Sequence, residues 1–211
     1  EEKQEIINVI IKTNNKRVPL VLGVGGNNTA LVIEELKTRD FTGLDGILSV
    51  APYYSKPTQE VFYQHFKAIA EATDLPIILY NVPGRTRSNM EWQTTIRLAK
   101  AREKFVGIKE ATGDLIHTTQ IIKNRPEGFL VLSGDDEVVL PMISCGADGL
   151  ISVIGNAIPA AYSKMIDSAL KSDFKTARSI NFNSFDIHKW LYIEGNPVGI
   201  KSAMKVLGLC D

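Results

Sequence analysis

The chain has 211 residues, of which 44% are hydrophobic and 23% charged, a composition typical of a folded globular protein and not of a disordered or low-complexity one. Its 24 basic and 24 acidic side chains balance and form no long basic run, so we expect neither nucleic acid nor a membrane surface as a partner. Cys145 and Cys210 lie far apart, without the spacing of a disulfide framework or a zinc site, which favours a reducing, cytoplasmic location.

The chain opens on a broad apolar stripe that predicts a helix over residues 1–13. Because this helix has neither a capping residue nor an initiator methionine before it, we expect the sequence to be a piece of a longer protein. Short runs rich in valine and isoleucine follow, and they predict strands buried on both faces: Val18–Val24, Gly46–Val50, Pro76–Tyr80, Phe105–Ile108, Phe129–Leu132 and Gly149–Val153. Amphipathic segments between them predict helices: Thr29–Thr38, Thr58–Ala72, Trp92–Ala101 and Leu115–Asn124.

This alternation of strands and helices predicts a parallel α/β fold, either a barrel or a doubly wound sheet. No linker or shift in composition divides the chain, so a single core is expected. After Ile158 the pattern becomes wholly helical. We therefore expect a strand-bearing part over residues 1–157 and a C-terminal helical region over residues 158–211.

In parallel α/β folds the functional site lies at the carboxyl ends of the strands, which makes Lys109 the most informative residue. It directly follows Val106-Gly107-Ile108, a run that should be buried. A lysine in that position can extend its amine to the rim of the fold, pair with Glu110, or lose solvent and act as a Schiff-base nucleophile. Its position alone leaves all three interpretations open.

Further polar residues follow the other strands. Tyr80 could relay protons or simply pack its ring and bond its hydroxyl. Tyr53 and Tyr54, beside Pro52, are typical of loop packing or of a contact between subunits. Arg85, after a Pro-Gly turn, could bind a carboxylate or stay solvated.

Two sets of residues that resemble metal sites have simpler interpretations. Asp135-Asp136-Glu137 could offer oxygen ligands, but acidic residues there are better explained as the cap of the helix that follows. The three histidines, His65, His117 and His188, are too scattered for a metal cluster or a catalytic triad, and we expect them on helix faces.

Four motifs occur in an order that resembles the dihydrodipicolinate synthase family, and the resemblance extends over essentially the whole chain. They are Pro52-Tyr53-Tyr54, Tyr80-Asn81-Val82-Pro83-Gly84-Arg85, Gly107-Ile108-Lys109-Glu110-Ala111-Thr112-Gly113 and Leu132-Ser133-Gly134-Asp135-Asp136. Asp148-Gly149-Leu150-Ile151-Ser152-Val153 and Glu194-Gly195-Asn196-Pro197 continue the likeness. Four ordered motifs are far more specific than any one of them.

The resemblance implies a (β/α)8 barrel with extra C-terminal helices, of which residues 1–157 would hold strands 3–8. It implies a lyase, usually a homotetramer built as a dimer of dimers, that condenses pyruvate with aspartate semialdehyde in lysine and diaminopimelate biosynthesis. It implies no metal or organic cofactor. By motif, Lys109 would form the Schiff base, and Tyr80 and Tyr54 would relay protons, Tyr54 across a subunit interface. Arg85 would bind the semialdehyde carboxylate, and Gly134 and Ile151 would line the pyruvate pocket.

Two departures from the family pattern stand out. The family's Gly-Thr-Thr-Gly-Glu loop is absent, so we expect a fragment that is a poor catalyst on its own. Leu31 occupies the position of a glutamate that binds lysine in feedback-inhibited members, although Tyr53 and Asn27 remain in place. Weak or absent lysine feedback is therefore predicted.

Other functions stay open within and outside this class. N-acetylneuraminate lyase and the keto-sugar-acid aldolases share the barrel and the lysine–tyrosine pair, although Arg85 favours the small dicarboxylic product. A catalytically silent pyruvate-binding or assembly module is the alternative outside enzymes, because one barrel hosts many functions.

Overall fold

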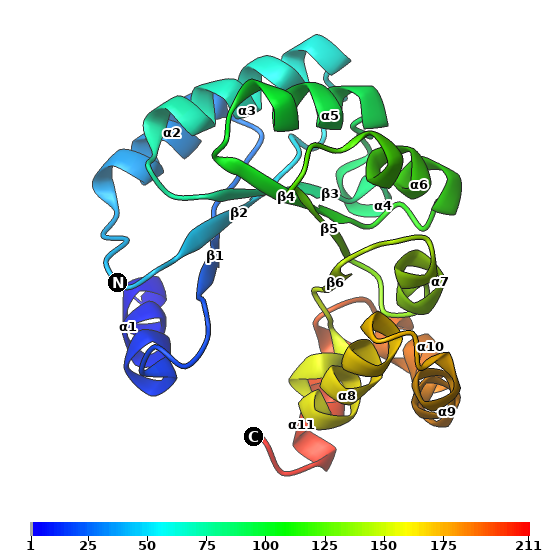
Figure 1. Cartoon of the computed structure of the whole chain (residues 1–211). Helices are drawn as coiled ribbons and strands as arrows, with labels where there is room; N and C mark the ends of the chain where they lie inside the picture. Colours follow the sequence, from blue (N-terminus) through cyan, green and yellow to red (C-terminus); the bar gives the residue numbers. More distant parts are fainter. Residues whose placement is uncertain (1) are drawn as a thin grey trace. The chain divides into compact units, whose positions relative to one another are not determined.

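The computed structural model describes residues 2–211, so that Glu1, the first residue of the predicted N-terminal helix, lies outside them. The chain forms two compact units (Figure 1). Unit 1 comprises residues 1–108 and 125–129, and unit 2 comprises residues 109–124 and 130–211. The proposed division at residue 157 stays a prediction, although the helices that were predicted beyond Ile158 are present.

The described residues contain one six-stranded sheet whose strands follow the chain order. The strands are β1 (Val21–Gly23), β2 (Gly46–Val50), β3 (Ile77–Asn81), β4 (Phe105–Glu110), β5 (Leu130–Ser133) and β6 (Gly149–Leu150). Pairing is parallel between β1 and β2, between β2 and β3, and between β5 and β6. Strands in sequential, parallel order confirm the predicted α/β fold and are those of a (β/α) barrel. The boundary between the units falls within β4, after Ile108.

In unit 1, three helices pack side by side along the strands (Figure 1). They are α2 (Thr29–Thr38), α3 (Gln59–Ala72) and α5 (Trp92–Ala101); α1 (Glu2–Asn14) and the short α4 (Pro83–Thr86) complete the unit. The caps explain where two of them begin, because Asn28 accepts from the amides of Ala30 and Leu31, and Thr58 accepts from that of Val61. The core consists of fully buried apolar side chains, including Ile47, Phe62, Phe66, Ile69, Ile77 and Leu79.

Unit 2 continues the alternation and then becomes helical. Its elements after the end of β4 are α6 (Leu115–Asn124), β5, α7 (Val139–Ser144), β6, the 3-10 helix η1 (Ile154–Asn156), α8 (Pro159–Leu170), α9 (Phe174–Ser184), α10 (Ile187–Tyr192) and α11 (Val198–Val206). A single apolar cluster joins α7, η1, α8, α9, α10 and α11, with Ile154 and Met165 fully buried in it. Among residues 2–211, no helix combines the length and the apolar character needed to cross a membrane.

Two strands are shorter than their apolar runs predict. Before β1, the amide of Val18 donates to Asn14 Oδ1 and that of Leu20 to Asp45 Oδ2, so side chains take the place of a partner strand. Pro19, between them, has no amide hydrogen to donate. β6 ends at Leu150 because the chain turns into η1 a few residues later.

The buried histidine of α3 predicts a pH dependence of the folding stability. His65 is 4% exposed, and its Nδ1 lies 2.8 Å from Thr29 Oγ1. Burial lowers the pKa of His65 from 6.5 to about 4, so between these values the unfolded chain binds a proton that the folded chain does not. The folded state should therefore lose stability as the pH falls through this window, and be fully stabilised above about 6.5.

We expect His65→Asn to weaken this pH dependence, because an asparagine amide can still reach Thr29 but has no proton to gain. Between pH 7 and pH 4, the free energy of unfolding should fall more for the unmodified chain than for the variant, by of the order of 2 kcal/mol. Urea unfolding at a series of pH values measures the difference. Equal losses in the two proteins would show that His65 titrates normally.

Candidate active site

Lys109 lies where β4 ends, directly after the buried residues Gly107 and Ile108. Its side chain is half-buried, and burial lowers the pKa of the Lys109 amine below its ordinary value. The negative charge of Asp136 opposes part of that decrease. A lowered pKa raises the fraction of neutral amine, which is the form that attacks a carbonyl carbon. The Schiff-base role of Lys109 stays a prediction, with which this burial is consistent.

Gly134 forms a backbone wall beside this lysine. Its amide donates to the carbonyl of Glu110 at 2.7 Å, which ties the loop after β5 to the end of β4. A Cβ atom at Gly134 would lie 2.7 Å from Ala111 Cβ and 3.0 Å from Lys109 Cε. Real Cβ atoms essentially never show the 2.7 Å approach, and the approach to Lys109 is tighter than most real contacts, so a side chain at residue 134 would require the loop, the end of β4 or Lys109 to shift.

Glu110 is directed away from a pairing with Lys109. Its Oε1 accepts from the amide of Thr112 at 2.9 Å, and its Oε2 lies 3.4 Å from His117 Nε2. Successive side chains of a strand point to opposite faces, which separates Glu110 from Lys109. His117 lies on α6, as the sequence predicted, and it also contacts this carboxylate, which is 1% exposed.

Asp136 is the residue of this site that the sequence did not predict. The expected cap of α7 was wrong: α7 begins at Val139, and Val138 caps it without a side-chain hydrogen bond. The buried carboxylate of Asp136 instead accepts from Ser152 Oγ at 2.5 Å and from the amides of Val153 and Ile154 at 2.9 and 3.2 Å. It stabilises the turn after β6, a contact sixteen to eighteen residues along the chain that helix-cap rules do not anticipate.

Ile151 begins that turn. It is half-buried, and its amide donates to the carbonyl of Ser133 at 2.9 Å. Lys109, Gly134, Asp136 and Ile151 thus gather at the carboxyl ends of β4, β5 and β6, all within unit 2. We call these four residues the lysine cluster.

A second cluster lies within unit 1 and consists of Tyr54, Tyr80 and Arg85. Tyr80 is half-buried near the end of β3, and burial raises the pKa of its phenol, while the positive charge of Arg85 partly opposes the increase. Arg85 is exposed on α4. Buried Asn81 fixes the segment after α4, because its Oδ1 accepts from the amide of Met90 and its amide group donates to Asn89.

The loop of Tyr54 is attached to the same segment. The amide of Tyr54 donates to the carbonyl of Thr86 at 3.1 Å, and Ser88 Oγ donates to the carbonyl of Pro52 at 2.5 Å. Tyr54 has a φ of 72°, a left-handed backbone that a bulky residue rarely adopts, and its side chain is 88% exposed. Such strain persists where the surrounding structure enforces it, often at functional sites. These bonds therefore present an outward-facing phenol on a fixed loop.

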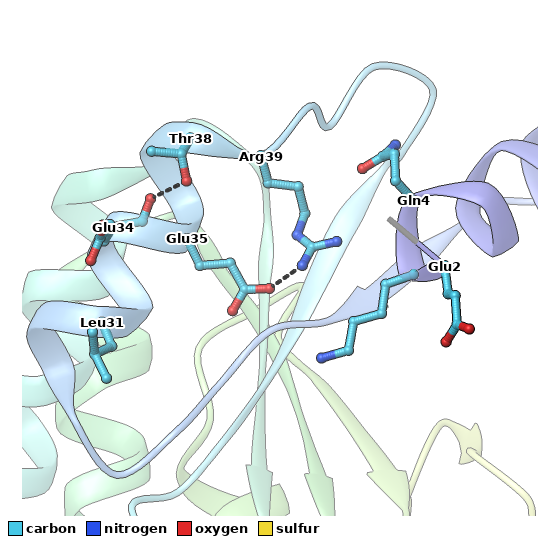
Figure 2. Close-up of a pocket in the computed structure, with 8 residues that line it drawn as sticks. Glu2, Gln4, Leu31, Glu34, Glu35, Thr38 and Arg39 are labelled. Atoms are coloured by element: carbon cyan, nitrogen blue, oxygen red, sulfur yellow. Dashed lines mark hydrogen bonds and ion pairs between the residues drawn. The ribbon is translucent and has the colours of Figure 1, made fainter.

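Leu31, at the position connected with lysine feedback, is exposed on α2. Figure 2 shows it in an open pocket between α1 and α2, in which Arg39 pairs with Glu35 at 2.6 Å. Other carboxylates line the pocket, but residue 31 supplies only an apolar surface to it. Weak lysine feedback stays a prediction.

A parallel α/β fold with a desolvated lysine at the end of a strand is typical of the aldolase-type lyases. The model of the dihydrodipicolinate synthetase family matches residues 1–211, and the chain belongs to this family. It is 49% identical over 211 residues to the 4-hydroxy-tetrahydrodipicolinate synthase of Parabacteroides distasonis and 51% identical to that of Azobacteroides pseudotrichonymphae. In each comparison the match covers 100% of this chain and 71% of the relative.

Solved structures agree with this assignment. The dihydrodipicolinate synthase of Aquifex aeolicus superimposes with a TM-score of 0.94 at 40% identity, over 100% of this chain and 72% of that one. The chloride-inhibited enzyme of Acinetobacter baumannii, determined in complex with pyruvate, gives 0.94 at 43% identity over the same shares. A monomeric dihydrodipicolinate synthase variant gives 0.96 at 32% identity, over 100% of this chain and 71% of that one.

Proposed function

We propose that this chain carries the Schiff-base chemistry of 4-hydroxy-tetrahydrodipicolinate synthase, condensing pyruvate with L-aspartate 4-semialdehyde. The observation that carries the proposal is the half-buried Lys109 amine, which lies against Gly134 at the end of β4 with a lowered pKa. Family membership supports the choice of reaction. A pyruvate complex of a relative that is 43% identical supports the choice of the first substrate.

In the first half of the reaction, the neutral amine of Lys109 attacks the C2 carbonyl carbon of pyruvate. A C–N bond forms, the carbonyl oxygen leaves as water, and the product is a protonated imine. The positive nitrogen withdraws electrons, so the methyl carbon can lose a proton and become a nucleophilic enamine carbon. Gly134 and Ile151 supply the backbone and apolar walls of the pyruvate pocket.

In the second half, the enamine carbon attacks the aldehyde carbon of the semialdehyde, and the aldehyde oxygen gains a proton to become a hydroxyl group. The amine of the semialdehyde then attacks C2 and displaces Lys109, which closes the ring and restores the free lysine. One water is released overall, and no oxidant or reductant is needed. We assign the proton transfers to Tyr80 and Tyr54, since a phenol hydroxyl can both donate a proton and accept one.

Tyr54 points to a catalytic role for a neighbouring subunit. Its phenol is exposed and its loop is fixed, as expected of a side chain that completes its contacts in a partner copy. We therefore include a dimer of dimers in the proposal, with the cytoplasm as its location. The free thiols of Cys145 and Cys210 are consistent with a reducing compartment.

Arg85 gives a test of the second substrate. An exposed guanidinium on the short helix α4 can bind a carboxylate through paired donors, and glutamine cannot supply that charge. We expect Arg85→Gln to raise KM for aspartate semialdehyde by about tenfold or more, with little change in KM for pyruvate. The measurement is the initial rate of aldehyde consumption at high protein concentration.

Arg87→Gln is the matched control, because Arg87 is an exposed arginine two residues along the same segment. It should leave both KM values unchanged. Unchanged KM values in Arg85→Gln would remove Arg85 from the substrate site. Faster consumption of a sugar aldehyde than of aspartate semialdehyde by the unmodified chain would favour a keto-sugar-acid aldolase instead.

A further inference from the structure

The buried hydroxyl of Ser88 has no part in the reaction as proposed. Ser88 follows α4 and is 7% exposed, and its Oγ donates to the carbonyl of Pro52 at 2.5 Å. Pro52 is also buried, and it lies two residues before Tyr54. A buried carbonyl that loses its donor is costly, so this bond holds the start of the Tyr54 loop firmly.

Two hydrogen bonds join the loop of Tyr54 to the segment after α4. The Ser88 hydroxyl donates to the carbonyl of Pro52, and the amide of Tyr54 donates to the carbonyl of Thr86 at 3.1 Å. Each segment thus supplies one donor and one acceptor, on residues that are two positions apart. Two attachment points fix the orientation of the loop as well as its place.

The segment that holds the loop is itself fixed. Thr86 is 3% exposed, and its Oγ1 accepts from the amide of Ser88 at 3.3 Å. The same hydroxyl lies 2.8 Å from the carbonyl oxygen of Ser88 and 3.1 Å from that of Val82, either of which can accept its proton. Arg85 directly precedes Thr86. The guanidinium assigned to the second substrate and the loop of Tyr54 therefore share one hydrogen-bonded support.

Tyr54 needs such support because its backbone is strained and its side chain is exposed. A φ of 72° is costly for a bulky residue, and a ring that is 88% exposed gains little from packing that could offset this cost. The direction of the phenol is therefore set by the backbone of the loop, which the bond from Ser88 helps to hold.

We propose that Ser88 is a positioning residue for Tyr54, because its buried hydroxyl holds the strained loop in the conformation that presents the phenol. This inference rests on the proposed function, which assigns proton transfer to Tyr54. Ser88 acts through the loop and not on the substrates. Its effect can still be large, since a misplacement of about 1 Å can lower a rate about a hundredfold.

The first test measures the loop without any substrate. In Ser88→Ala, we expect the amide of Tyr54 to exchange with deuterated solvent about fivefold faster or more, because the loop is held at one point instead of two. Hydrogen exchange followed by NMR resolves single amides, and those of β2 should exchange at their unmodified rates if the chain is folded. An unchanged rate at Tyr54 in the folded variant overturns the inference.

Ser55→Ala is the matched control, because Ser55 is an exposed serine next to Tyr54. It should leave the exchange of the Tyr54 amide unchanged. Ser88→Cys decides the question if Ser88→Ala does not fold, since a thiol fills at least the space of the hydroxyl but is only a weak donor. Faster exchange at Tyr54 is expected in this variant too, and an unmodified rate there would overturn the inference.

The second test asks whether Ser88 acts through Tyr54. Ser88→Ala should lower the rate of condensation at saturating substrates about tenfold, while pyruvate trapping, which the proposed function assigns to residues of unit 2, stays unchanged. In the Tyr54→Phe background, Ser88→Ala should cause no further loss, because the phenol that Ser88 positions is already absent.

Equal losses in the two backgrounds would overturn the positioning role, because Ser88 would then act independently of the phenol. A loss confined to the background that keeps Tyr54 supports it. Failure of the unmodified chain to condense the two substrates would count against the proposed function alone, and hydrogen exchange would still decide whether Ser88 fixes the loop of Tyr54.

Discussion

Lys109→Arg is expected to abolish the trapped pyruvate adduct and to lower the condensation rate by about a thousandfold or more. Arginine keeps the positive charge and much of the length of the side chain. Its guanidinium, however, stays protonated at any pH at which the protein is folded, so it offers no nucleophilic lone pair. The variant therefore removes the nucleophile and keeps the charge.

Lys123→Arg is the control for this change. Lys123 is an exposed lysine at the end of α6 in the same unit. The Lys123→Arg variant should form the pyruvate adduct and condense the substrates at the unmodified rate. Intact mass after borohydride reduction and initial-rate measurements give the two readouts. Adduct formation in Lys109→Arg at the unmodified level would place the Schiff base on another amine.

Gly134→Ala is expected to lower the rate of pyruvate trapping at least about a hundredfold while the chain still folds. The new methyl group would meet Ala111 Cβ at 2.7 Å and Lys109 Cε at 3.0 Å. The Ala111 contact can be relieved only by a shift between the loop and the end of β4, which the Gly134 amide joins, and such a shift would displace Lys109. A displacement of about 1 Å at a reacting nitrogen is enough for a loss of this size.

The stability cost of the same variant should be about 1–3 kcal/mol, typical of one methyl group too many in a packed site. Gly23→Ala is the matched control, because a Cβ atom at Gly23 would have nothing within 4 Å. Urea unfolding and the trapping rate should both stay near the unmodified values in that control. A folded Gly134→Ala that traps pyruvate at the normal rate would show that the added methyl group does not displace Lys109.

Most of the fold could be predicted because periodic patterns are strong where elements are regular. The helices over Thr29–Thr38, Trp92–Ala101 and Leu115–Asn124 begin and end where the apolar stripes predict. The strand Gly46–Val50 also agrees, since the consecutive apolar residues of a buried parallel strand leave little choice of limits. The parallel order then follows from the alternation of strands and helices.

The sequence was less informative where long-range hydrogen bonds replace local rules. Asp136 was predicted to be a helix cap, but its partners lie at Ser152 to Ile154, and no local pattern specifies that distance. The shortened β1 has the same cause, because Asp45 takes the amide of Leu20 from 25 residues away. The left-handed backbone of Tyr54 could not be predicted either, since bulky residues rarely adopt it.

The candidate site, too, could be predicted from the sequence only in part. Motifs indicated Lys109, Gly134 and Ile151, and the structure places them together in unit 2. What the motifs did not indicate is how these residues are held, which depends on the Gly134–Glu110 backbone bond and on the carboxylate of Asp136. A sequence motif can indicate a residue that reacts, because its chemical type is visible there. The residues that hold it in place are identified only from their contacts in the structure.

The most direct test of the central claim is to incubate the unmodified chain with pyruvate, reduce it with borohydride, and locate the product by intact mass and peptide mapping. The residues assigned to imine formation all belong to unit 2, so one reduced pyruvate adduct is expected, on the peptide that carries Lys109. A protein that gains no mass, or one that is modified at a different lysine, would contradict the assignment of Lys109 as the Schiff-base nucleophile.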